Sequence, residues 1–167
     1  MIFHYHFAER IKKEEGSDHI MKSIVLYSSH TGRTKKIAEH VVSGLPEGTP
    51  CLPVEEMPAD INSYDCVFLG CWADGDAVDA GAVQALEHLN NKNVAVFVTV
   101  QSGPFSDDSA KILRTVIDVL PSGCKIVGTY VTPTEREDNK EESDQKARAF
   151  ARDFAENTLD RLMGAGV

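Results

Sequence analysis

The sequence predicts an α/β protein in which a five-stranded parallel sheet carries helices on both faces, giving three layers. Three observations lead to this prediction. Apolar runs that are continuous rather than alternating recur along the chain, as in strands buried on both faces. Segments with helical spacing of apolar residues separate these runs, and strands alternating with helices form parallel sheets. No internal repeat or low-complexity tract interrupts the alternation.

The expected elements follow one another regularly from residue 22 onward. Strands are predicted over 23–28, 50–54, 65–71, 93–100 and 125–131. Helices are predicted over 33–44, 79–89, 107–120 and 142–162, with residues 133–144 as an exposed charged loop before the last one. Helical spacing assigns Ile117 and Phe150 to the buried stripes of the last two helices. With right-handed crossovers, the expected strand order is 2-1-3-4-5.

Residues 1–20 differ from the remainder because they sustain no periodicity, and residues 16–18 read as a linker. We interpret this segment as an N-terminal extension, flexible or non-native, with Met21 as the native start and one domain over 21–163. The alternative is a genuine helix over 6–15 that docks on the domain.

Composition excludes several classes of protein. The net charge of −9 argues against nucleic acid and against an anionic membrane surface. No apolar run is long enough to span a bilayer, and the start does not resemble a secretory signal. The four cysteines contain no C-x-x-C pair, so we expect reduced thiols in a cytoplasmic protein rather than a metal site. Acidity suits a partner with a basic face or a neutral small molecule, although solubility alone also explains it.

The turn "SSHTGRT" over residues 28–34 joins the first strand to the first helix. A helix amino end offers N–H groups and partial positive charge, Gly32 allows close backbone approach, and Ser29, Thr31 and Thr34 supply hydroxyls. These features predict a phosphate cradle. The alternative is an ordinary capped turn. Neither G-x-x-x-x-G-K nor G-x-G-x-x-G occurs, which argues against triphosphatase and dinucleotide sites.

"SHTGRT" resembles the T/S-x-T-G-x-T phosphate loop of flavodoxins. The resemblance implies the flavodoxin-like three-layer sandwich and the cofactor FMN. The phosphate is expected among the residues Ser29, His30, Thr31, Gly32, Arg33 and Thr34. For His30 we expect the backbone N–H to matter more than the ring. The family usually has Asn or Thr in place of Arg33, which either adds charge to the site or points outward.

"GCWADGDAV", residues 70–78, resembles the flavodoxin loop G-x-W-x-x-G-D/E. The resemblance makes Trp72 the ring that stacks on the flavin and Gly75–Asp76 the peptide beside the flavin nitrogen N5. A core tryptophan is the alternative. The other cofactor-binding residues expected here are Cys71, Ala73 and Asp74. The residues expected to form a negative rim at the flavin edge are Asp74, Asp76, Asp79, Asp107 and Asp108.

The third loop, "TVQSGPFSDD" over residues 99–108, departs from the family pattern. Flavodoxins usually place a Tyr or Trp here against the outer flavin face. The residues expected to line this part of the site are Gln101, Ser102, Gly103 and Phe105. Either Phe105 is the displaced ring, or one flavin face is open and leaves room for an organic substrate.

The resemblance implies a flavodoxin, an FMN-binding electron-transfer protein that carries low-potential single electrons between redox partner proteins. The alternative is an FMN-dependent reductase, or a flavodoxin-like subunit that passes electrons to a bound small organic substrate. A regulatory module without cofactor is a third possibility. We expect an electron carrier rather than a stand-alone enzyme, with no catalytic residues and no metal ligands.

Overall fold

The computed structural model describes residues 21–74, 77–90, 92–100, 107–133 and 140–164. Its sheet has the strand order β2-β1-β3-β5-β6, all parallel, with β4 antiparallel to β3 beside this path. The strands are β1 (Ser23–Tyr27), β2 (Cys51–Pro53), β3 (Cys66–Asp74), β4 (Ala77–Val78), β5 (Asn93–Val100) and β6 (Lys125–Pro133). Without the two-residue β4, the order is the predicted 2-1-3-4-5, so that prediction is confirmed.

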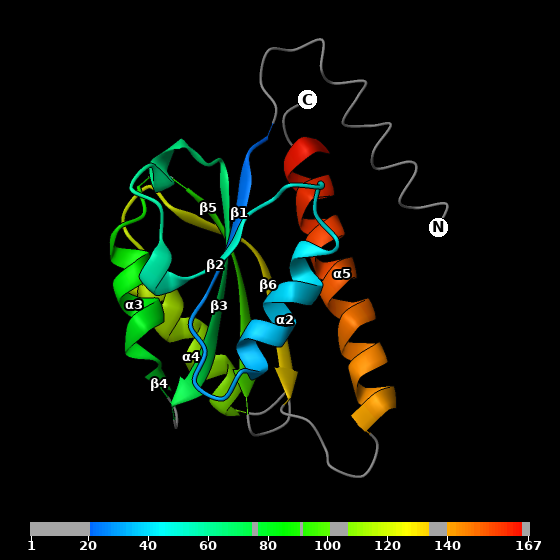
Figure 1. Ribbon diagram of the computed structural model, residues 1–167. Helices are drawn as coiled ribbons and strands as arrows, with labels where there is room; N and C mark the ends of the chain where they lie inside the picture. The colour runs from blue at the N-terminus through cyan, green and yellow to red at the C-terminus, as the bar shows by residue number, and fades with distance from the viewer. Residues whose placement is uncertain (1–20, 75–76, 91, 101–106, 134–139, 165–167) are drawn as a thin grey trace.

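Helices cover both faces of the sheet, as predicted (Figure 1). The helices are α2 (Arg33–Val42), α3 (Ala80–Glu87), α4 (Asp107–Val119) and α5 (Lys140–Gly164), with short 3-10 turns η1 (Val54–Glu56) and η2 (Ile61–Ser63). The pair α2 and α5 packs on one face, and α3 and α4 lie on the other. Among the described residues, no helix combines the length and the apolar character needed to cross a membrane.

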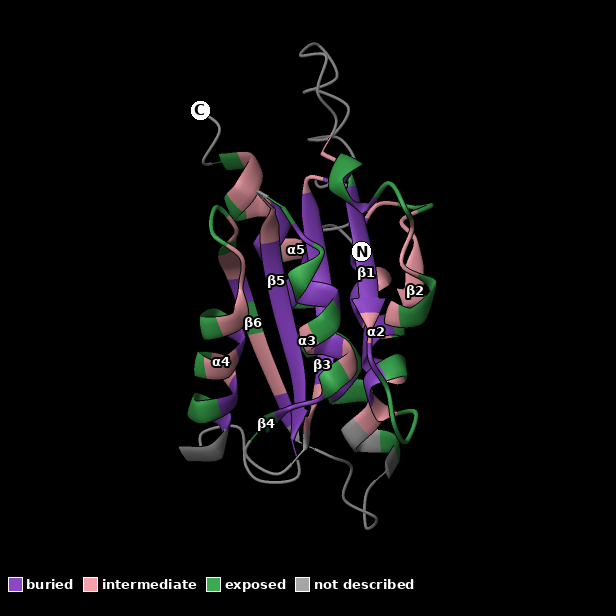
Figure 2. Cartoon of the chain, turned by 90° about the vertical axis from the view of Figure 1, so that its left-hand side faces the viewer, coloured by how far each residue is buried: buried purple, intermediate pink, exposed green. Residues whose placement is uncertain are grey.

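Two hydrophobic clusters, one on each face, hold the layers together. Strand side chains alternate between them: Phe68 and Phe97 meet α2 and α5, whereas Leu69 and Val96 meet α3 and α4. Figure 2 shows the central strands almost wholly buried and the outer helical surfaces exposed. The continuous apolar runs in the sequence therefore arise because β1, β3 and β5 are covered on both sides.

Gly70 allows a close contact between two neighbouring strands of the sheet. A Cβ at this position would lie 2.3 Å from the ring of Phe97 on the neighbouring strand. The missing side chain leaves room for that ring, and the Gly70 carbonyl accepts a hydrogen bond from Ser28 N at 2.9 Å. This hydrogen bond links the end of β1 to β3 at the start of the predicted phosphate turn.

Several sequence predictions were wrong in detail. Ile117 and Phe150 are 57% and 58% exposed rather than buried. Each adjoins a buried residue, Val116 or Ala151, and one helical residue turns by about 100°, which carries the neighbour off the buried stripe. α5 begins at Lys140, so part of the predicted loop is helical. Residues 1–20 lie outside the described residues, and the interpretations of that segment remain predictions.

Candidate functional site: a hydroxyl-rich turn beside Trp72

The turn between β1 and α2 lies at the edge of the sheet where the parallel strands end (Figure 1). Gly32 is the N-cap of α2 and has a φ of 89°, a left-handed conformation that glycine adopts at little cost. The first bond of the helix runs from Lys36 N to Gly32 O at 3.1 Å. The chain therefore passes sharply from strand to helix, and the helix amino end faces the ligand edge of an α/β sheet.

Ser29 organises this turn through its hydroxyl. Its Oγ accepts hydrogen bonds from Gly32 N at 3.1 Å and from Lys35 N at 3.4 Å. A hydroxyl that accepts in this way still has its own proton to donate. Ser29 and Thr31 are exposed, so both can present donors to a ligand on the outer side of the turn.

Thr34 is held differently, because it is buried at 2% exposure. Its hydroxyl lies 3.0 Å from that of Thr99, at the end of β5, and either atom can be the donor. If Thr34 donates to an anion, it must accept from Thr99, since each hydroxyl has one proton. The two residues thus link the turn to the strand that precedes the third predicted loop.

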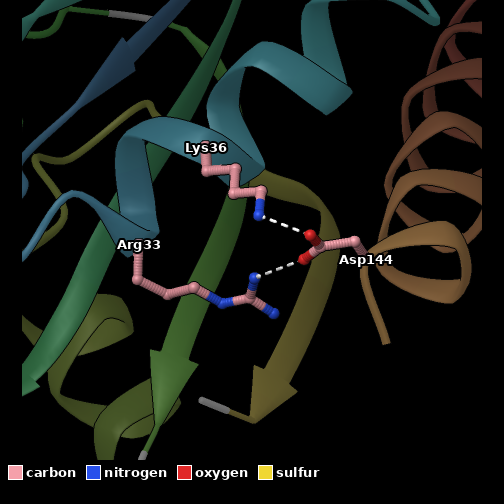
Figure 3. Close-up of polar contacts among 3 residues, drawn as sticks. All are labelled: Arg33, Lys36 and Asp144. Atoms are coloured by element: carbon pink, nitrogen blue, oxygen red, sulfur yellow. Dashed lines mark hydrogen bonds and ion pairs between the residues drawn. The ribbon is translucent and has the colours of Figure 1, made fainter. Parts of the chain in front are cut away.

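The first turn of α2 carries an unusual charge pattern. It contains no acidic residue, yet Arg33, Lys35 and Lys36 are all cationic. Cations near a helix amino end are unfavourable unless an anion balances them. Asp144 of α5 supplies one such anion, to Lys36 at 2.7 Å and Arg33 at 3.8 Å (Figure 3). Hydroxyl donors, helix N–H groups and cations together form a donor set that fits a phosphate.

The Arg33 side chain does not point outward, because only 10% of it is exposed. Its guanidinium extends toward Asp144 of α5 (Figure 3). Burial raises the pKa of Tyr130 on β6, and a side-chain hydrogen bond with Thr132 and the nearby charge of Arg33 oppose that rise. The alternative in which Arg33 points outward is therefore wrong, and its contribution to a cofactor site stays a prediction.

Trp72 lies beside this turn, within β3 rather than in a loop. It is half-buried, and its ring stacks on that of His30 with centroids 5.1 Å apart and planes 26° apart. The imidazole of His30 thus contacts the ring expected to meet the flavin, a contact that the sequence interpretation did not include; the expected role of the His30 backbone N–H stays a prediction. The strand register could have indicated this contact, since Tyr27 pairs with Gly70 and both chains continue in the same direction.

Asp79 holds the position of Trp72 and was wrongly assigned to the negative rim. It is buried at 2% exposure. Its carboxylate accepts hydrogen bonds from Trp72 N and Ala82 N, both at 3.0 Å, and its own N–H donates to Trp72 O at 3.2 Å. Asp79 therefore caps α3 and fastens the end of β3, because an N-cap carboxylate satisfies N–H groups of the first helical turn.

Cys71 and Ala73 adjoin Trp72 but contribute differently. The Cys71 thiol is fully buried in the core and lies 3.8 Å from the Phe97 carbonyl. Burial, reinforced by the charge of Asp79, raises its pKa far above the ordinary range. Only the backbone of Cys71 can therefore face a ligand. Ala73 is half-buried and pairs with Val78 of β4.

Part of the predicted site lies outside the described residues. Asp74 pairs with Ala77 through the backbone, which places the predicted Gly75–Asp76 peptide between β3 and β4 in sequence. The predicted residues that fall outside the described ranges are Gly75, Asp76, Gln101, Ser102, Gly103 and Phe105. Their assignment to the site stays a prediction, as does the rest of the negative rim.

Comparison with known proteins identifies the family. The family model described as "Flavodoxin domain" matches residues 24–149. The chain belongs to the flavodoxin domain family. The resemblance to flavodoxins is thereby confirmed, together with the flavodoxin-like fold.

The flavodoxin-like domain-containing protein BilS of Clostridioides difficile (strain CD3) is similar to this flavodoxin-domain chain. The two are 36% identical over 114 residues, which cover 66% of this chain and 65% of BilS. BilS of Clostridium symbiosum (strain WAL-14163) is 24% identical over 127 residues, 66% of this chain and 67% of that protein. The chain thus spans slightly less than two thirds of the C. difficile relative.

Solved flavodoxins show the same fold. Fusobacterium nucleatum flavodoxin bound to flavin mononucleotide matches with a TM-score of 0.59 at 17% identity, covering 87% of this chain and 99% of that one. Oxidised flavodoxin 2 from Bacillus cereus matches with a TM-score of 0.57 at 24% identity, covering 81% and 99%. At these identities the likeness concerns the architecture.

Proposed function

We propose that this flavodoxin-domain chain binds FMN and carries electrons to a redox partner protein. The observation that carries the proposal is the first turn of α2, where three cations and no acid follow a hydroxyl-rich turn at the ligand edge of the sheet. The whole protein is acidic, with a net charge of −9, so this concentration of positive charge is local. Asp144 balances part of this charge, and a phosphate group is a ligand that fits the remainder of the donor set.

The chain's own residues would divide the work of holding FMN. Ser29, Thr31 and Thr34 supply hydroxyl donors for the phosphate. The N–H groups of Gly32 and Lys35 donate to Ser29 Oγ, so backbone donors would come from other residues of the turn and of the first helical turn. Arg33 adds charge that α5 and β6 shield from water. Trp72 offers an aromatic face at the neighbouring strand end, fixed in place by Asp79. When bound, FMN supplies the redox chemistry, and the protein supplies binding, orientation and electrostatics.

The partner we propose is a redox protein with a basic docking face. An acidic surface attracts such a partner and speeds its association, and salt weakens this attraction. Electron transfer to the partner should therefore slow as ionic strength rises. The salt dependence of FMN binding is measured separately, on the isolated chain.

The proposal is tested by adding FMN to the purified chain and recording the visible absorbance spectrum after removal of free flavin. We expect a stoichiometric flavin spectrum that dithionite bleaches and a one-electron acceptor protein restores. A chain that retains no flavin at micromolar concentration is not a flavoprotein under these conditions, and the module without cofactor would then be the better description.

A second candidate is a flavodoxin-like subunit of an FMN-dependent reductase that passes electrons to a bound small organic substrate. The observation in its favour is the sequence of residues 101–106, "QSGPFS", which has no Tyr or Trp to cover the outer flavin face. Oxidation of NADH or NADPH by the FMN-loaded chain alone would favour this candidate. A carrier without its own pyridine nucleotide site should show no such turnover.

A further inference from the structure

The carboxylate of Asp144 joins the start of α5 to the first turn of α2. Lys36 Nζ donates to Oδ2 at 2.7 Å, and Arg33 Nη1 lies 3.8 Å from Oδ1. Figure 3 shows both cationic side chains extending from α2 toward this one carboxylate. The contact is long-range, since Lys36 and Asp144 are 108 residues apart in the sequence.

These ion pairs are partly shielded from water. The side chains are 10% exposed in Arg33, 29% in Asp144 and 34% in Lys36. Charges at such positions interact more strongly than fully exposed pairs, which contribute little to stability. The carboxylate therefore exerts a real influence on where the two cations lie and how much positive potential they present.

The same two cations adjoin the phosphate turn. Arg33 directly follows Gly32, and the backbone N–H of Lys36 donates to the Gly32 carbonyl at 3.1 Å. Two anions can thus attract the same pair of cations. The Asp144 carboxylate is always present, whereas the phosphate of a ligand is present only when the ligand is bound.

We propose that Asp144 is a positioning residue that sets how tightly the turn holds a phosphate. By keeping Arg33 and Lys36 paired with its own carboxylate, Asp144 balances the cationic helix end while the site is empty and lowers the affinity for FMN. This inference rests on the proposed FMN binding. It adds that Asp144 lowers the affinity for FMN and stabilises the chain when no ligand is bound.

The test compares Asp144→Asn with Asp153→Asn, an exposed position on the same helix. Each variant removes one negative charge. At low ionic strength, Asp144→Asn should bind FMN roughly three- to tenfold more tightly than the parent chain, because one nearby repulsive charge is gone and Arg33 and Lys36 no longer pair with it. Riboflavin, which lacks the phosphate, should bind with unchanged affinity, and Asp153→Asn should stay within about twofold for both ligands.

Two further measurements separate this role from a merely structural one. The gain in FMN affinity should shrink in 0.5 M salt, because salt at this concentration screens interactions between partly exposed charges. Without ligand, Asp144→Asn should unfold at lower urea concentration than the parent, because the helix end has lost its counter-charge. Lys36→Gln is the converse variant: it removes one of the two cations that pair with Asp144, and FMN affinity should fall.

Unchanged or weakened FMN binding by Asp144→Asn would overturn the inference, as would an equal gain in riboflavin affinity or in Asp153→Asn. If the parent chain binds no FMN, the proposed function fails. If the parent binds FMN and the Asp144 variant matches it, only this inference fails.

Discussion

The imidazole of His30 stacks on the indole of Trp72, with ring centroids 5.1 Å apart and planes inclined by 26°. The contact connects the phosphate turn to the end of β3, the two segments that sequence motifs assign to opposite ends of the cofactor. It places an aromatic platform where the flavin ring is expected, already supported on one side by a residue of the turn.

His30→Ala should destabilise the chain by about 0.5–1.5 kcal/mol, the range for an aromatic pair. It should also shift the emission of Trp72 to longer wavelength, because water reaches the uncovered ring face. Trp72 is the only tryptophan, so the fluorescence reports on this site alone. The control is His88→Ala, an exposed helix-end position, which should leave the emission unchanged. An unmoved spectrum in His30→Ala would show that the stack does not persist in solution.

Asp79→Ala should lower the free energy of unfolding by about 2–4 kcal/mol, because it removes an N-cap and leaves the buried N–H of Trp72 without this acceptor. Asp79→Asn keeps one acceptor oxygen and loses the other, so it should cost less than Asp79→Ala while still losing one of the two hydrogen bonds. Urea denaturation measures both variants. Equal losses in the two would mean that the charge of Asp79, rather than its hydrogen bonds to Trp72 and Ala82, matters.

The buried hydroxyls of Thr34 and Thr99 should show strong coupling in a double-mutant cycle. Thr99→Val leaves the Thr34 hydroxyl without this partner and should cost about 1–3 kcal/mol. Thr34→Val should cost a similar amount. The double variant replaces both by apolar groups of the same shape, so it should be more stable than the sum of the two losses predicts. Additive losses would place the two hydroxyls out of contact.

Alkaline pH should weaken the fold through buried thiols. Burial, with a smaller contribution from the charge of Asp65, raises the pKa of Cys66 from 9.0 to about 12. The unfolded chain therefore releases this proton first, and the stabilising contribution present below pH 9 is lost as pH rises toward the folded-state pKa. The free energy of unfolding should fall by up to about 1.4 kcal/mol per pH unit for this thiol.

Urea titrations at pH 8 and pH 10.5 measure the loss. Cys66→Ala removes the ionising group, so its stability should fall less steeply over the same interval, even if the variant starts from a lower value. Identical slopes in the parent and in Cys66→Ala would assign the alkaline loss to other groups, of which Tyr27 and Tyr130 also have pKa values raised mainly by burial.

The sequence alone predicts the layers and the strand order, because both-face burial leaves long apolar runs that short-range patterns reveal. It does not predict β4, since two residues pairing with the end of β3 leave no periodic signal. It misplaces Ile117 and Phe150 because a helical stripe of apolar residues has edges, and packing against the sheet decides which edge is covered.

At the site, the local motif indicates the phosphate turn, but its supports come from distant positions. Thr99 lies 65 residues from Thr34, and Asp144 lies 108 from Lys36. Such contacts depend on which strand ends and helix ends the topology brings together. The sequence groups Asp79 with the rim carboxylates because no local pattern shows its burial or its two N–H donors. Both depend on the close approach of α3 to β3.

The most direct test of the account is a titration of the flavin-free chain with FMN and with riboflavin, followed by the emission of Trp72. We expect both flavins to quench Trp72 and FMN to bind at least about tenfold more tightly, through phosphate contacts of the turn. Thr31→Ala combined with Thr34→Ala should weaken FMN binding by about 1–3 kcal/mol and leave riboflavin nearly unaffected. Equal affinities for the two flavins, or FMN binding without quenching of Trp72, would contradict the placement of the phosphate in this turn and of the flavin beside Trp72.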